Sequence, residues 1–138
     1  MERVQGTGPR LRSAATLRPM DAWELADVDA ARTAAGRLYH EFLSVPDLSA
    51  GLYVLDAGAS DPQSPHGEDE LYVVMEGRAS VTVGNETRAI QPGSLVFVGA
   101  AVPHHFHDIT ERLVLVVAFG PAEYSRQAGG AGAPDGAG

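Results

Sequence analysis

The chain has 138 residues and a formal net charge of −8, and all ten of its basic side chains are arginines. This length suits one domain, and 44% hydrophobic with 20% charged residues is typical of a globular protein. The acidic balance argues against nucleic acids and anionic membranes as partners, because both require a basic surface. The absence of cysteine and lysine excludes thiolate and Schiff-base chemistry.

Composition divides the chain into three expected parts. Residues 1–18 carry four arginines but no apolar run that could serve as a signal peptide, which predicts a flexible arm and a cytoplasmic location. Residues 125–138 are rich in Gly and Ala, which predicts a disordered tail. The folded domain is then expected at 19–124. No segment approaches the roughly 18 consecutive apolar residues that a membrane helix needs.

One helix is expected ahead of a series of strands. Asp21 is a candidate N-cap for a helix from about Trp23 to Ala35, which Gly36 would end. Gly-containing turns at 76–78, 84–86 and 91–93 would form tight hairpins, and the 70–75 strand is expected to be covered on both faces. This spacing predicts a small all-β barrel or sandwich. The expected strands are 38–45, 52–55, 70–75, 80–83, 88–90, 95–98, 104–109 and 113–119.

The histidines are distributed unevenly, and three of the five fall within four positions. His66 and Glu70 are four residues apart, so on an extended chain their side chains share a face. His104 faces the opposite way from His105 and His107 on the later strand. Convergence of His66, Glu70 and His104 would bring together two imidazoles and one carboxylate. That ligand set is typical of non-haem iron with open positions, and zinc would also accept it.

Two segments resemble the conserved motifs of the cupin superfamily. Residues 58–77, GASDPQSPHGEDELYVVMEG, are similar to the first motif, in which histidines precede a glutamate that is followed seven residues later by glycine. Glu70 and Gly77 keep that interval. Residues 93–108, GSLVFVGAAVPHHFHD, are similar to the second motif, and His104 falls at its histidine. The resemblance covers about residues 38–119 and implies a jelly-roll β-barrel with a short N-terminal helix.

The resemblance also implies one divalent metal ion, held by His66, Glu70 and His104. Ser64 stands where the family's usual first histidine is found, so one of four common ligands is missing. Gln63 is close by and could supply an amide oxygen. An apolar pocket would face the open coordination positions, and Tyr72 could also orient a substrate. The expected pocket residues are Tyr53, Tyr72, Phe97 and Phe106.

A metal-dependent enzyme acting on a small molecule is the function that this resemblance implies, with a dioxygenase-like iron enzyme expected first. Two alternatives stay open: an isomerase or lyase on zinc or manganese, and a ligand-binding or sensory module without catalysis. Iron, manganese, nickel and zinc all accept this ligand set. His40, His105 and His107 are expected to be structural or solvent-exposed. A homodimer is expected under every alternative.

Overall fold

The computed structural model describes residues 19–63 and 65–123, so the expected arm and tail, together with Ser64 and Tyr124, lie outside the described residues. One helix precedes six strands, which confirms the all-β prediction. Within the described ranges, no helix is long and apolar enough to cross a membrane. The elements are α1 (Leu25–Ala35), β1 (Tyr39–Val45), β2 (Leu48–Leu55), β3 (Asp69–Val83), β4 (Glu86–Ile90), β5 (Leu95–Val98) and β6 (His104–Gly120).

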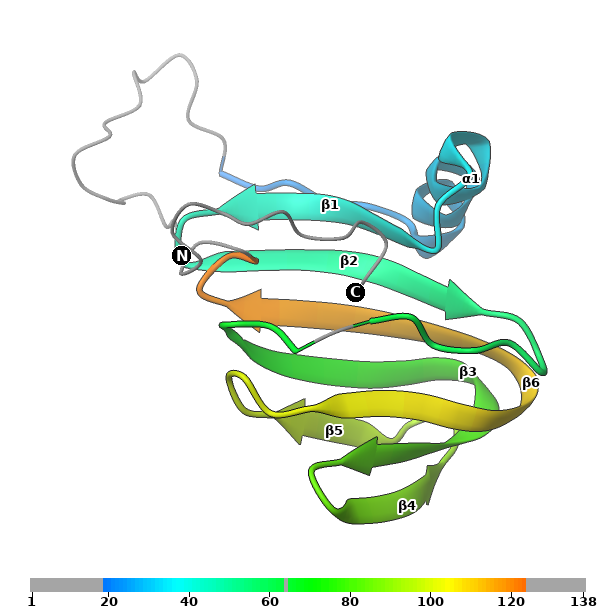
Figure 1. The fold of residues 1–138 in the computed structure, drawn as a ribbon. Coiled ribbons are helices and arrows are strands. Elements are labelled where there is room, and N and C mark those ends of the chain that lie inside the picture. Colours follow the sequence, from blue (N-terminus) through cyan, green and yellow to red (C-terminus); the bar gives the residue numbers. More distant parts are fainter. Residues whose placement is uncertain (1–18, 64, 124–138) are drawn as a thin grey trace.

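The strands form one antiparallel sheet in the order β1-β2-β6-β3-β4, and β5 pairs with the first part of β3 (Figure 1). The long strands β3 and β6 bend, so the sheet curls around one interior. Alternate side chains of each strand point into that interior and form the main core. Its largest members under 2% exposed are Tyr53, Tyr72, Phe106, Phe119, Leu55, Leu113 and Leu115.

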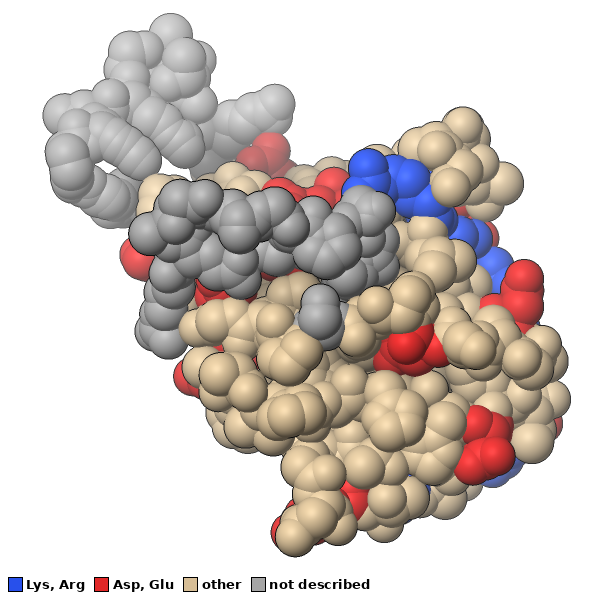
Figure 2. All heavy atoms as spheres, viewed as in Figure 1, with Lys and Arg blue, Asp and Glu red and all other residues tan. Residues whose placement is uncertain are grey.

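Helix α1 ends as predicted but begins later than predicted. Its N-cap is Glu24, which makes no side-chain capping bond, so Asp21 does not cap it. Gly36 adopts φ 70° after the last turn, a left-handed conformation in which glycine carries no steric cost. Val28 packs against an outward-facing apolar cluster of β2 and β6, and Figure 2 shows basic side chains gathered beside the helix.

Two pairs of predicted strands are each one continuous strand. The runs 70–75 and 80–83 both belong to β3, and the runs 104–109 and 113–119 both belong to β6. Gly77 was predicted in a hairpin turn, which is wrong: it lies inside β3, where the pairing with β6 shifts register. A Cβ at Gly77 would clash with the carbonyl oxygen of Arg112. Such an irregularity bends a strand without ending it.

The outward face of β3 and β5 carries apolar side chains that nothing within the described residues covers. Leu71 and Met75 on β3 are exposed, so the prediction of a strand covered on both faces is wrong. Phe97 on β5 is 64% exposed. Its side chain therefore does not line an interior pocket, because inward and outward positions alternate along a strand and its neighbour Val98 is the buried one.

Candidate metal centre

Glu70, Tyr72 and His104 meet inside the curled sheet. Glu70 and Tyr72 point inward from the start of β3, as their two-residue spacing predicts. β5 pairs with the same part of β3, with Val98 opposite Glu70, and the turn that follows β5 delivers His104 at the start of β6. Glu70 is 2% exposed and His104 is 5% exposed, so the interactions between them are shielded from water.

The imidazole of His104 presents its Nε2 atom to these side chains. Nδ1 of His104 donates a hydrogen bond to the carbonyl oxygen of Val102 at 2.9 Å. Nε2 lies 3.4 Å from Oε2 of Glu70 and 3.1 Å from the hydroxyl of Tyr72. That hydroxyl lies 2.5 Å from Oε1 of Glu70 and donates to it. A histidine held at one ring nitrogen by a backbone carbonyl, with the other nitrogen facing a carboxylate, has the orientation usual for a metal ligand.

Gln63 completes the group from the loop before β3. Its Oε1 lies 3.1 Å from Nε2 of His104 and 2.9 Å from the hydroxyl of Tyr72. Its Nε2 donates to Asp61 at 2.6 Å. Asp61 also accepts hydrogen bonds from the Tyr53 hydroxyl at 2.5 Å and from the backbone of Phe106 at 2.8 Å. No spacing in the sequence marks Asp61, because its partners come from β2 and β6.

The group holds more hydrogen-bond acceptors than donors. Nε2 of His104 faces oxygens of Gln63, Glu70 and Tyr72, and the single phenolic proton of Tyr72 serves only one acceptor. Burial, then the charge and hydrogen bond of Glu70, raise the pKa of Tyr72 well above 10, so that proton stays in place. Burial alone would lower the pKa of His104, but the hydrogen bond and charge of Glu70, with the Val102 carbonyl and the charge of Asp61, together raise that pKa above 6.5. The donor set therefore fits a cation.

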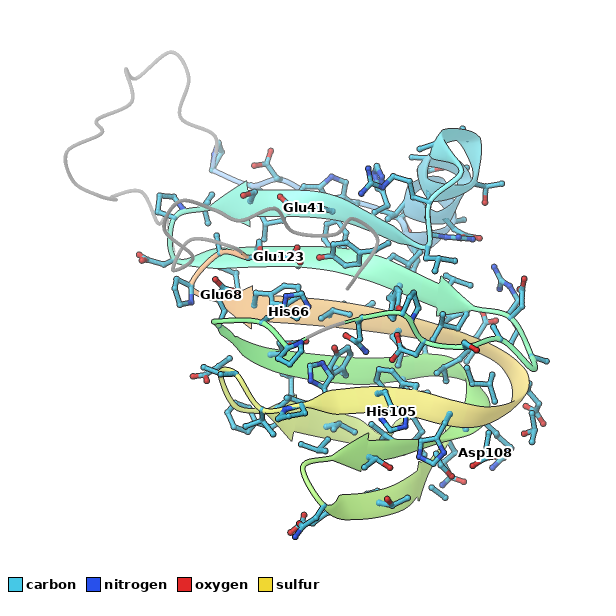
Figure 3. All side chains as sticks on the ribbon, viewed as in Figure 1. Glu41, His66, Glu68, His105, Asp108 and Glu123 are labelled. Carbon is cyan, nitrogen blue, oxygen red and sulfur yellow. The ribbon has the colours of Figure 1, made fainter. Side chains whose placement is uncertain are left out.

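His66 is buried but lies apart from this group. Its Nδ1 is 3.7 Å from Oε2 of Glu123, and Figure 3 shows the two residues with Glu68 at one end of the sheet. The ring centroids of His66 and His104 are 6.3 Å apart. Two imidazoles on one metal, with metal–nitrogen distances of about 2.0–2.1 Å and angles of about 90–109°, would place their centroids roughly 4.5–5.2 Å apart. His66 would have to move to share a metal with His104 in adjacent coordination positions.

The structure thus gathers part of the predicted ligand set. His104 is within contact of both Glu70 and Gln63, whereas His66 is beside Glu123. In residues 19–63 and 65–123, no three side chains among His, Cys, Asp and Glu are placed to hold a metal. A site through Glu70 and His104 therefore needs the amide oxygen of Gln63 or a shift of His66.

Three of the four predicted pocket residues line the interior beside this group. Tyr53, Tyr72 and Phe106 are fully buried, and the rings of Tyr72 and Phe106 meet edge to face with centroids 4.9 Å apart. Phe97, as described above, is on the outer face. The inner surface near His104 is therefore largely aromatic.

Comparison with known proteins identifies relatives of the whole domain. A protein of Streptomyces coelicolor, described as uncharacterized protein SCO3923, is 47% identical over 104 residues, which are 75% of this chain and 99% of that protein. The fold resembles the crystal structure of TT1209 from Thermus thermophilus, with a TM-score of 0.60 and 24% identity over 74% of this chain and 98% of that one.

The same fold occurs in structures described as RmlC-like cupins. The one from Shewanella frigidimarina gives a TM-score of 0.56 and 24% identity, covering 61% of this chain and 75% of that chain. The one from Methanocaldococcus jannaschii, described as having a double-stranded β-helix fold, gives a TM-score of 0.57 and 17% identity, covering 62% of this chain and 81% of that chain. Residues 51–119 match the family described as the Cupin domain. The chain is therefore a member of the cupin family, with the all-β jelly-roll fold that this family shares.

Proposed function

We propose that this cupin is a metal-dependent enzyme that acts on a small molecule, with the metal held by Glu70, His104 and Gln63. The observation that carries the proposal is the surplus of acceptors around Nε2 of His104. A buried carboxylate and an amide oxygen that face one imidazole nitrogen favour positive charge at that nitrogen, supplied either by a ring proton or by a bound cation. His66 as a second imidazole ligand remains a prediction.

The metal would act as a Lewis acid. Iron would support oxygenase chemistry there, whereas zinc or manganese would support isomerase or lyase chemistry. The chain's own residues supply the rest. Tyr72 holds its proton at the hydroxyl oxygen and can hydrogen-bond a polar atom of a substrate. Phe106 and Tyr53 keep water away from the buried group, which strengthens its electrostatic interactions. Asp61 fixes the direction of the Gln63 amide.

The test is reconstitution followed by an activity assay. The protein is loaded anaerobically with iron, manganese, nickel or zinc, and the variants E70Q, H104Q and Q63A are treated in the same way. We expect at least a tenfold loss of metal affinity in E70Q and H104Q and a smaller loss in Q63A. H40A is the matched histidine control, because His40 lies on β1 outside the group. Oxygen uptake by the iron form with phenolic, thiol and diketone substrates then tests the oxygenase reaction.

A ligand-binding cupin without catalysis is the second candidate. One observation favours it: Tyr72, Glu70 and His104 already hydrogen-bond one another, while His66 lies beside Glu123. This candidate predicts that the wild-type protein takes up no metal at the inner group under any loading condition. It also predicts that H66A leaves the affinity for a small-molecule ligand unchanged.

A further inference from the structure

A second histidine pair lies on the outer face of β6. His105 and His107 are two residues apart on an extended strand, so they share the face opposite to His104. His105 is exposed and His107 is partly exposed. Figure 3 shows His105 and Asp108 on the first half of β6, well separated from His66, Glu68 and Glu123. The proposed inner metal group uses none of these outer side chains.

The spacing of the two rings suits a shared metal ion. The ring centroids of His105 and His107 are 4.8 Å apart, with 32° between the ring planes. This separation falls inside the range of roughly 4.5–5.2 Å that two imidazoles on one metal require. The inner pair, at 6.3 Å, falls outside the same range. The outer pair therefore already has the separation that two imidazoles in adjacent coordination positions require.

Asp108 orients His107 in the way that metal-binding histidines are oriented. Nδ1 of His107 donates to Oδ2 of Asp108 at 2.7 Å. Because the carboxylate only accepts, the proton of the neutral ring sits on Nδ1, and Nε2 carries the lone pair. A carboxylate on one ring nitrogen and a metal on the other is one of the usual arrangements of histidine metal sites.

The lone pair on Nε2 of His107 accepts a hydrogen bond from Thr82, which has a second acceptor available. Nε2 lies 2.7 Å from the hydroxyl of Thr82 on β3, which donates to it. The same hydroxyl lies 2.7 Å from the hydroxyl of Thr87 on β4. When a metal takes Nε2, the Thr82 hydroxyl can donate to Thr87 instead, so it keeps an acceptor.

We propose that His105 and His107 form a second, outward-facing site for a divalent transition metal of the copper, nickel and zinc class. The ligands are Nε2 of His107 and a ring nitrogen of His105, and water completes the coordination. Asp108 holds His107 in position. Within the described ranges, no group of three His, Cys, Asp or Glu side chains is placed to hold a metal, so the site has two protein ligands. Imidazole ligands bind Cu²⁺ more tightly than Ni²⁺ or Zn²⁺. The net charge of −8 attracts cations to the surface.

The test uses Cu²⁺ alone as the probe, titrated by calorimetry into wild-type protein and into H105A, H107A, D108N and T82V, with H40A as the control. We expect H105A and H107A each to lose at least tenfold in affinity for one copper equivalent. D108N should lose about tenfold, since removing a carboxylate behind a ligating histidine costs about 10–100-fold. T82V should bind as tightly as wild type or more tightly, because it removes the competing hydroxyl, while H40A should not change.

A spectroscopic readout separates this site from the inner one. The copper form should show nitrogen hyperfine coupling from two imidazoles in its electron paramagnetic resonance spectrum, and H105A should reduce it to one. Equal copper affinity in wild type, H105A and H107A would overturn the proposal. A signal that vanishes in H104Q but persists in H105A would also overturn it, because the copper would then occupy the inner group. Circular dichroism of each variant confirms that the fold is intact.

Discussion

Asp61 determines which end of the Gln63 amide faces His104. The Asp61 carboxylate only accepts hydrogen bonds, so the amide nitrogen of Gln63 turns toward it, at 2.6 Å. The amide oxygen must then point the other way, where it lies 3.1 Å from Nε2 of His104. Asp61, a loop residue outside the predicted ligand set, thus turns the amide oxygen of Gln63 toward the inner group.

Replacing Asp61 should therefore alter both stability and metal binding. In D61N the new amide can donate, so Gln63 can flip and present its nitrogen to His104. We expect a loss of about 1–3 kcal/mol in the free energy of unfolding, because hydrogen bonds to a charged acceptor are lost, and a weaker metal affinity at the inner group.

Urea denaturation and metal titration measure the two effects of D61N. D56N is the control, since the Asp56 side chain is 85% exposed and its ion pair with Arg112 spans 4.0 Å. We expect D56N to change stability by less than about 0.5 kcal/mol. Equal stability losses in D61N and D56N would contradict the role assigned to Asp61.

Alanine substitutions at Gly77 and Gly93 separate the cost of a positive φ angle from the cost of a steric clash at Cβ. Both adopt positive φ angles, 96° and 95°. A Cβ at Gly77 would meet the backbone of Arg112, whereas a Cβ at Gly93 would meet nothing within 4 Å. We expect G93A to cost about 1 kcal/mol from strain alone and G77A about 3 kcal/mol or more. Thermal or urea unfolding measures the difference, and similar losses would show that β3 and β6 are not in close contact at Gly77.

Truncation of Phe106 should destabilise the protein much more than truncation of Phe97. Phe106 is 1% exposed in the core and Phe97 is 64% exposed on the outer face. F106A should lower the free energy of unfolding by about 3–5 kcal/mol, and F97A by less than about 1 kcal/mol at low protein concentration. Comparable losses would place Phe97 in an interior after all. A concentration-dependent loss in F97A, followed by sedimentation, would instead indicate that the expected homodimer uses this face.

Tyr53 should remain un-ionised in the folded protein. Burial and then the charge and hydrogen bond of Asp61 raise the pKa of Tyr53 far above its ordinary value of 10.0. Because the folded pKa is raised, this contribution to stability is fully present below pH 10 and is lost as pH rises above it. Alkaline titration followed by tyrosinate absorbance should therefore show equal folded-state amplitudes for wild type and Y53F.

The same tyrosinate titration of the unfolded proteins serves as the internal control. In the unfolded state, wild type should show one more titrating tyrosine than Y53F, because Tyr53 then ionises near pH 10. A folded wild-type protein that already titrates one more tyrosine than Y53F would show that Tyr53 is accessible to water.

Local patterns in the sequence predicted most of the fold. Alternation placed Glu70, Tyr72 and His104 on inward faces, and the turn residues located the ends of most strands. The fusion of two strands into β3 was missed, because Gly77 is typical of a turn as well as of a bulge. The difference depends on the backbone of Arg112, which is distant in sequence.

Site residues could be predicted from the sequence only where the alternation along their own strand sets the direction of the side chain. Glu70 and His104 met as expected, whereas His66 belongs to a loop whose course depends on contacts such as the one between its carbonyl oxygen and the backbone of Ala101. Asp61 carries no local signal, since its role comes from bonds to two separate strands. Phe97 was misplaced because an apolar residue on a strand fits either face equally well, and only the pairing of β5 with β3 decides between them.

The metal content of the inner group tests the central claim most directly. The H105A/H107A double variant removes the outer pair, so metal bound after anaerobic reconstitution reports on Glu70, His104 and Gln63 alone. We predict close to one metal ion per chain in this variant and a loss of that ion when E70Q or H104Q is added. Absence of bound metal with iron, manganese, nickel and zinc would contradict the account and favour a cupin that binds its ligand without a metal.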